Sequence, residues 1–111
     1  MEESPIFSKT YDLLQWLIPQ TLGFPKAQRF VIALRVQQTT FNFYEELVRA
    51  GKGVNQAEAM RRADVALEQL RLYLRLCKDL GLLSLRQYEH SARLTDEIGR
   101  LLGGWLKKAG R

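Results

Sequence analysis

Apolar residues recur every three or four positions along most of the chain, which is the spacing of one face of an α-helix. Four such runs predict helices over about residues 7–18, 25–50, 56–80 and 85–106. Pro19 is expected to end the first helix, because proline lacks an N–H donor and its ring collides with the preceding turn. Gly103 and Gly104 are expected to loosen the end of the last helix. No period-two alternation lasts long enough to predict a strand.

The connections between the predicted helices are short, and two of them carry start signals. Asn55 followed by Glu58, and Ser84 followed by Gln87, each match the capping-box pattern of a helix N-terminus. Helices joined by short connections pack as antiparallel neighbours. We therefore expect an all-α protein in which residues 1–111 form a single up-down-up-down antiparallel four-helix bundle.

The second predicted helix carries two neighbouring apolar stripes. One stripe contains Phe30, Leu34, Phe41, Tyr44 and Val48, and the other contains Val36, Thr40, Phe43 and Leu47. Two stripes predict burial on two sides, within the bundle or against another subunit. The inner face of the third helix is expected to end at Leu80, and that of the fourth to begin at Leu85. Trp16 lies in a segment that is apolar nearly all round, which predicts either self-association or a side chain that closes the end of the bundle.

The charge of the chain says more about which classes of partner it can bind than its composition does. Hydrophobic residues make up 46% and charged residues 26% of the 111 residues, which is typical of a globular domain. The formal net charge is +5. Residues 23–53 and 81–111 each carry a net +3, because five basic residues stand against two acids in the first segment and six against three in the second. A folded basic surface attracts nucleic acid, acidic protein or anionic membrane, although a merely soluble basic protein fits equally well.

The N-terminus and the cysteine content indicate the compartment. The first residues are acidic and lack the basic start and apolar stretch of a secretory signal. No apolar run approaches the ~20 residues that cross a bilayer. The single cysteine, Cys77, excludes an internal disulfide and is expected to pack as a small hydrophobic residue. We expect a cytoplasmic protein with no membrane partner.

Few residues have the chemistry for catalysis. Cys77 and His90 lie on different predicted helices, and together they supply too few ligands for a zinc site. The acid pairs at residues 45–46 and 96–97 point about 100° apart on a helix, so they are expected to be solvated and not to form a dyad. Arg86 and His90 form an Arg–His pair of the kind found in helical ribonucleases of the HEPN type, but their spacing and their place at a helix start fit that family poorly. We expect no enzymatic activity, no cofactor and no metal.

Basic residues recur on one side of the last two predicted helices. On the fourth helix, cations at intervals of seven residues share one face, and they are Arg86, Arg93, Arg100 and Lys107. On the third helix, another face carries Arg71, Arg75 and Lys78. A line of cations about 10 Å apart suits a phosphate backbone. The competing interpretation is a solvated face, because Glu89 and Asp96 each precede an arginine by four residues and can pair with it.

Several segments together resemble the Avd family. They are residues 5–7 (PIF), 9–17 (KTYDLLQWL), 24–30 (FPKAQRF), 74–80 (LRLCKDL) and 88–89 (YE), and the most specific is 96–107 (DEIGRLLGGWLK). The resemblance covers nearly the whole chain, from about Pro5 to Lys108. A family of four-helix proteins encoded within intervening sequences of 23S ribosomal RNA shares the fold and is the nearest alternative. The Phe-Pro-Lys and Gly-Gly-Trp strings favour Avd.

The resemblance implies more than the residues show on their own. Avd proteins are four-helix bundles that assemble into a basic, barrel-like homopentamer. They accompany the reverse transcriptase of a diversity-generating retroelement, bind that enzyme and nucleic acid, and support mutagenic retrohoming. The expected partners of this chain are therefore a reverse transcriptase, template RNA or cDNA, and further copies of itself.

Two other functions stay open at this point, a protein-binding bundle of the intervening-sequence type without nucleic-acid affinity and a ribonuclease. The residues expected to contact nucleic acid or the reverse transcriptase are Lys26, Arg29, Arg71, Arg75, Lys78, Arg86, Arg93, Arg100, Lys107 and Lys108.

Overall fold

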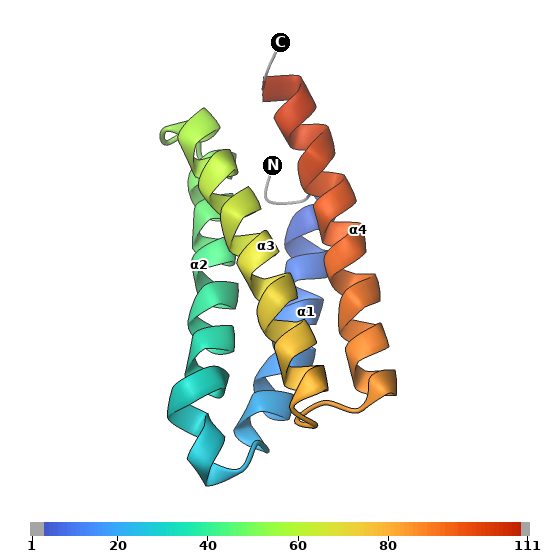
Figure 1. Ribbon diagram of the computed structural model, residues 1–111. Helices are drawn as coiled ribbons and strands as arrows, with labels where there is room; N and C mark the ends of the chain where they lie inside the picture. The colour runs from blue at the N-terminus through green and yellow to red at the C-terminus, as the bar shows by residue number, and fades with distance from the viewer. Residues whose placement is uncertain (1–3, 110–111) are drawn as a thin grey trace.

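Four long helices make up the fold in the computed structural model, which describes residues 4–109. They are α1 (Pro5–Leu22), α2 (Leu34–Gly51), α3 (Gln56–Asp79) and α4 (Leu85–Ala109). Consecutive helices run in opposite directions and α4 packs beside α1, so the chain forms an antiparallel four-helix bundle (Figure 1). No strand occurs within the described residues, and the all-α prediction is confirmed. Residues 1–3 and 110–111 of the predicted domain lie outside the described residues.

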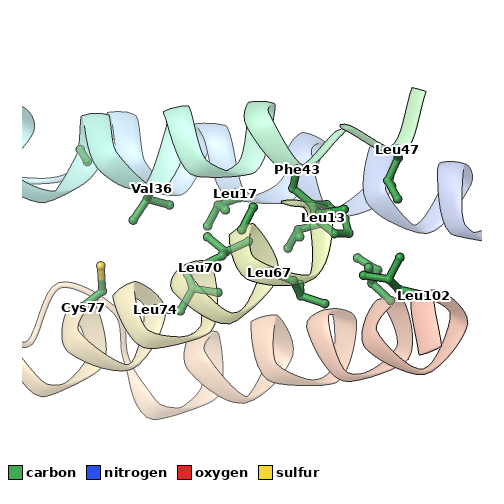
Figure 2. Packing of buried hydrophobic residues seen from close by; sticks show 14 of the residues in the cluster. Leu13, Leu17, Val36, Phe43, Leu47, Leu67, Leu70, Leu74, Cys77 and Leu102 are labelled. Atoms are coloured by element: carbon green, nitrogen blue, oxygen red, sulfur yellow. The ribbon is translucent and has the colours of Figure 1, made fainter. Parts of the chain in front are cut away.

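Apolar side chains from all four helices meet along the axis of the bundle. Figure 2 shows Leu13 of α1, Phe43 of α2, Leu70 of α3 and Leu102 of α4 in one cluster, and each of these side chains is buried. Burying a side chain of this size contributes about 1.5–3 kcal/mol to folding. The inner stripe predicted for the second helix therefore faces the core.

The helices α2, α3 and α4 extend beyond the start of α1 and are closed by a second small cluster. Ala50 and Met60 are buried there, and Trp105 of α4 packs against both the small cluster and the main core. The Trp105 ring also lies 5.6 Å from the ring of Phe7 in the first turn of α1. An aromatic contact of this kind fixes the end of α1 against α4.

Helix α1 continues through Pro19 to Leu22, so the predicted end at about residue 18 was wrong. Gln15, whose carbonyl loses its helical partner at Pro19, and Pro19 itself are both exposed, so water can satisfy the carbonyl. On the opposite side Leu17 and Thr21 are buried, and their packing holds the last turn. The burial of this inner face outweighs the local cost of the proline.

The chain enters α2 through two irregular turns. A 3-10 turn spans Lys26–Gln28, and a five-residue π-helical segment spans Arg29–Ala33 before regular α-helix begins. The predicted helix over residues 25–50 is thus helical almost throughout, but its first part has non-standard turns. Wide π-turns of this type are rare and often mark functional sites.

The two predicted capping boxes have different outcomes. The box at the start of α4 is confirmed, since the Gln87 backbone N–H donates to Ser84 Oγ at 3.1 Å and the Ser84 N–H donates to Gln87 Oε1 at 2.8 Å. The box at the start of α3 was wrong, because Asn55 has a left-handed backbone (φ 45°) and its side chain makes no cap hydrogen bond. Glu58 instead accepts hydrogen bonds from Arg61 and Arg62.

The end of α3 and the start of α4 also differ from the prediction. Leu80 and Leu85, which were expected on inner faces, are 54% and 63% exposed. They flank the turn between the two helices, where the bundle ends and no neighbouring helix covers them (Figure 1). Gly103 and Gly104 lie within α4, which runs on to Ala109, so these glycines do not loosen the helix. None of the helices in the described part of the chain is both long and apolar enough to cross a membrane.

Candidate nucleic-acid interface

The outer face of α4 carries a line of cations that we call the α4 stripe. The buried side of this helix is formed by Ser91, Thr95, Ile98 and Leu102. The stripe lies on the opposite side and consists of Arg86, Arg93, Arg100 and Lys107, all exposed. Successive members are separated by seven residues, or about 10 Å along the helix axis. The stripe thus presents positive charge along about 30 Å of a rigid rod.

The arginines at the centre of the stripe are not neutralised by the neighbours that the sequence offers. The expected pairs of Arg93 with Glu89 and of Arg100 with Asp96 do not form. Asp96 lies 3.6 Å from Nη1 of Arg71 on α3 instead. Within residues 4–109, Arg93 and Arg100 make no ion pair, so their charges are available to a ligand.

Arg71 is already engaged inside the fold. Its Nη2 atom donates to the Thr95 carbonyl at 3.1 Å, and its Nη1 atom pairs with Asp96. Gly99 provides the space for this guanidinium, because a Cβ at that position would collide with Arg71 Nη2. Arg71 therefore ties α3 to α4, and its charge is already paired with Asp96.

The other two candidate cations on α3, Lys78 and Arg75, differ in whether they are already engaged within the fold. Lys78 is half-buried, with Nζ 5.0 Å from the centre of the Tyr88 ring on α4 and 3.4 Å from Oδ1 of Asp79. Arg75 is exposed and, within the described residues, has no ion-pair partner. Arg75 is accordingly the α3 residue that can add a free charge to the α4 stripe.

The remaining candidate residues lie at the two ends of the bundle. Lys26 and Arg29 are exposed in the irregular turns before α2, at the end of the molecule where α4 begins (Figure 1). Lys108 is exposed next to Lys107 in the last turn of α4, at the opposite end. The ten predicted residues therefore fall into four groups: the α4 stripe with Lys108 next to its last member, Arg75 exposed on α3, Lys26 and Arg29 before α2, and Arg71 and Lys78, which the fold holds.

A family model described as bAvd-like matches residues 5–109 of the chain. The chain belongs to the bAvd-like family. The resemblance to Avd proteins that the sequence shows is thereby confirmed. A comparison with curated proteins found no match to the chain.

The other chemically interesting side chains of this bAvd-like chain are occupied by packing or by ion pairs. Burial raises the pKa of the Cys77 thiol to about 11, which keeps it protonated and poorly nucleophilic near neutral pH. The His90 ring packs against Trp16 of α1 at 4.9 Å between ring centres. Glu97 lies 3.7 Å from Nζ of Lys9. Trp16 is half-buried in this contact, along the α1–α4 side of the bundle.

Exposed apolar residues form a second type of surface, which sequence patterns revealed only in part. Along α3 they make the α3 ridge, defined by Val65, Leu72, Leu76 and Leu80, which are 42–62% exposed. On α1 and α2, the α1–α2 patch is defined by Tyr11, Phe41, Tyr44 and Val48, of which Tyr11 and Phe41 are exposed and the other two half-buried. Phe41, Tyr44 and Val48 belong to the outer stripe predicted for the second helix. The α3 ridge was missed, although its spacing of seven and four residues was a readable signal.

Proposed function

We propose that this bAvd-like protein is a non-catalytic accessory protein of a diversity-generating retroelement. It binds the reverse transcriptase and the template RNA or cDNA, and it assembles with further copies of itself to support mutagenic retrohoming. Family membership supports the accessory role. The observation that carries the nucleic-acid part is the α4 stripe, whose central arginines have no carboxylate partner in the described part of the chain.

The α4 stripe suits a phosphate backbone better than a base-specific contact. Cations spaced along a rod neutralise phosphates and release counterions, and this interaction is independent of sequence. The stripe belongs to a helix that is anchored on both sides, by Arg71 to α3 and by the contact of Trp16 with His90 to α1. The charges therefore keep their spacing when a ligand binds, and little conformational entropy is lost in the backbone.

The two apolar surfaces support self-association. A two-fold dimer uses one self-complementary patch, whereas a closed ring needs two different patches on each subunit. The α1–α2 patch and the α3 ridge lie on different helices and differ in composition, the patch being mainly aromatic and the ridge aliphatic, so they suit a ring in which one subunit's ridge packs on the next subunit's patch. We take the number of five subunits from the family resemblance alone. Native mass measurement of the purified protein checks it.

The nucleic-acid part of the proposal is tested by fluorescence anisotropy with a structured RNA at low and at physiological salt. We expect binding that weakens steeply as salt rises, and a large loss of affinity when Arg93 and Arg100 are both changed to Glu. Unchanged binding by this double variant would remove the stripe from the proposal. Absence of RNA binding even at low salt, together with a salt-insensitive protein complex, would favour a protein-binding module of the intervening-sequence type.

The reverse-transcriptase part is tested by co-expression and co-purification of the two proteins. We expect a stable complex of the two proteins. If the enzyme contacts the α4 stripe, the yield of the complex should fall when the charges of the stripe are reversed. If it contacts the apolar surfaces, the yield should fall when those surfaces are made polar. Failure to recover any complex would contradict the accessory role. RNA turnover that is abolished by His90→Ala would instead indicate a ribonuclease.

A further inference from the structure

The irregular entry into α2 pushes an aromatic ring into solvent. Phe30 is 82% exposed and Val31 is 67% exposed, although both lie in a helical segment. Their neighbours Ile32 and Ala33 occupy the inward positions of the π-turn and are buried. The outward position of Phe30 is therefore fixed by the core packing of the residues that follow it.

A hollow of about 300 Å³ opens beside this ring, and we call it the end hollow. It is lined by Thr21, Leu22, Arg29, Phe30, Ala33, Leu34 and Gln37. The volume is at the lower end of the range of small-ligand pockets. The end hollow is formed between the last turn of α1 and the first turns that lead into α2, which lie together at one end of the bundle (Figure 1).

The walls of the end hollow combine apolar surface with one polar pair. Gln37 Nε2 donates to Thr21 Oγ1 at 2.9 Å, and the Thr21 hydroxyl donates to the Ile18 carbonyl at 2.9 Å. The Gln37 amide keeps its oxygen and its second N–H, which make no other hydrogen bond within residues 4–109. A planar ligand in the hollow thus meets an aromatic face, apolar side walls, and one group that both accepts and donates.

The rim of the hollow carries Arg29, and Lys26 precedes this residue by three positions in the 3-10 turn. Both side chains are exposed, and neither forms an ion pair with a described residue. No acidic residue occurs between Asp12 and Glu45 in the sequence. The ligand that complements this rim carries negative charge next to a flat apolar body.

We propose that the end hollow binds an unpaired nucleobase, stacked on Phe30, while Arg29, and Lys26 in the turn before it, hold its flanking phosphates. This inference rests on the proposed function and adds to it the class of substrate. Base stacking on an aromatic side chain requires a base that is not already stacked within a duplex, so the site selects single-stranded segments. RNA and DNA share this chemistry.

The nucleobase is favoured over a protein side chain because three features coincide. The exposed ring matches the face of a base, the unpaired Arg29 and Lys26 match adjacent phosphates, and the Gln37 amide matches a base edge. An apolar protein segment would use the ring but would leave the amide without a partner. The end hollow also lies at the end of the bundle where α4, which carries the stripe, begins (Figure 1).

The test measures binding of fluorescein-labelled RNA to the full chain as a short single strand and as a blunt duplex of the same sequence, with matching DNA strands in parallel. Phe30→Ala is expected to weaken single-strand binding at least about fivefold and to change duplex binding less than about twofold. Phe30→Tyr keeps a ring and should restore the affinity. Val54→Ala, which removes an exposed apolar residue at the other end of the bundle, serves as the matched control. Comparing the RNA and DNA arms shows which strand the site prefers.

A second readout reports the stacking itself. A single-stranded probe with one 2-aminopurine should lose fluorescence on binding to the wild-type protein and to Phe30→Tyr, and should lose much less with Phe30→Ala. If Phe30→Ala weakened single-strand and duplex binding equally, or weakened neither, the inference would be overturned while the stripe still binds. The same holds if the 2-aminopurine probe lost no fluorescence on binding to the wild-type protein. A change of oligomeric mass in Phe30→Ala with both probes affected would show that the ring is a protein contact. No binding of any probe by the wild type would overturn the proposed function as well.

Discussion

The charge of the α4 stripe can be tested quantitatively through the salt dependence of binding. The informative change is Arg93→Gln together with Arg100→Gln, because both side chains are exposed and unpaired within the described residues. Removing exposed, unpaired side chains changes folding stability by less than about 0.5 kcal/mol, so the variant should fold normally. Glutamine removes the charge and keeps a polar, uncharged side chain, although one that is shorter than arginine.

The expected magnitude follows from the number of phosphates neutralised. Each cation in contact with a phosphate contributes a slope of about 0.7 to 0.9 to the fall of log K with log salt concentration, for single and double strands respectively. Loss of two contacts should make the slope shallower by about 1.4 to 1.8. If these contacts contribute nothing at 1 M salt, the affinity at 0.1 M should fall by roughly 25- to 60-fold.

The assay is a set of anisotropy titrations between 50 and 300 mM salt, with the wild-type chain and the double variant side by side. Arg61→Gln with Arg62→Gln is the matched control, since it removes the same net charge from two α3 residues that pair with Glu58 away from the stripe. The control should keep most of the wild-type slope. If the two double variants lose slope equally, net charge and not the stripe governs binding, and the reasoning is refuted.

Three further predictions concern the fold that supports these surfaces. Arg71→Ala should lower the free energy of unfolding by about 1–2 kcal/mol in urea titrations, because it removes the hydrogen bond to Thr95 and the pairing with Asp96. The control variant Arg75→Ala should change it by less than about 0.5 kcal/mol. Equal effects of the two variants would contradict the bridging role of Arg71. Gly103→Ala with Gly104→Ala should raise the free energy of unfolding by about 1–2 kcal/mol, because glycine inside a helix is costly and a Cβ at either position meets no atom within 4 Å. A lower melting temperature of this double variant would count against a continuous α4. The raised pKa of Cys77 predicts that its contribution to stability is fully present below its ordinary value of 9.0 and is lost as pH rises toward about 11, by roughly 1.4 kcal/mol per unit. The stability advantage of the wild type over Cys77→Ala in urea titrations should therefore shrink between pH 8.5 and pH 10.5, and a constant difference would contradict the burial of the thiol.

Features that depend on near neighbours along the chain could be predicted from the sequence. The bundle and the face shared by Arg86, Arg93 and Arg100 follow from the helical repeat alone. The start of α4 follows from Ser84 and Gln87, whose mutual hydrogen bonds span only three residues. These interactions have the same geometry in any helix, so the sequence is sufficient to find them.

Features that depend on which helices meet were decided by the tertiary structure. The continuation of α1 through Pro19 depends on the burial of Leu17 and Thr21 against the rest of the bundle. Asp96 pairs with Arg71 on α3 and not with Arg100 four residues away, because α3 brings a second cation within reach. Because Asp96 pairs with Arg71, the charge of Arg100 is left available to a ligand. No local sequence pattern predicts this pairing.

The same distinction explains the candidate sites. Periodicity identified the outer stripe of the second helix as apolar, but it cannot say whether another helix covers that stripe. Within the bundle Phe30 stays exposed, because the π-turn directs Ile32 and Ala33 inward in its place. The end hollow then arises where two segments, residues 21–22 and 29–37, come together. The sequence determines which faces are charged or apolar through local geometry, and only packing between helices decides which of those faces remain open to a partner.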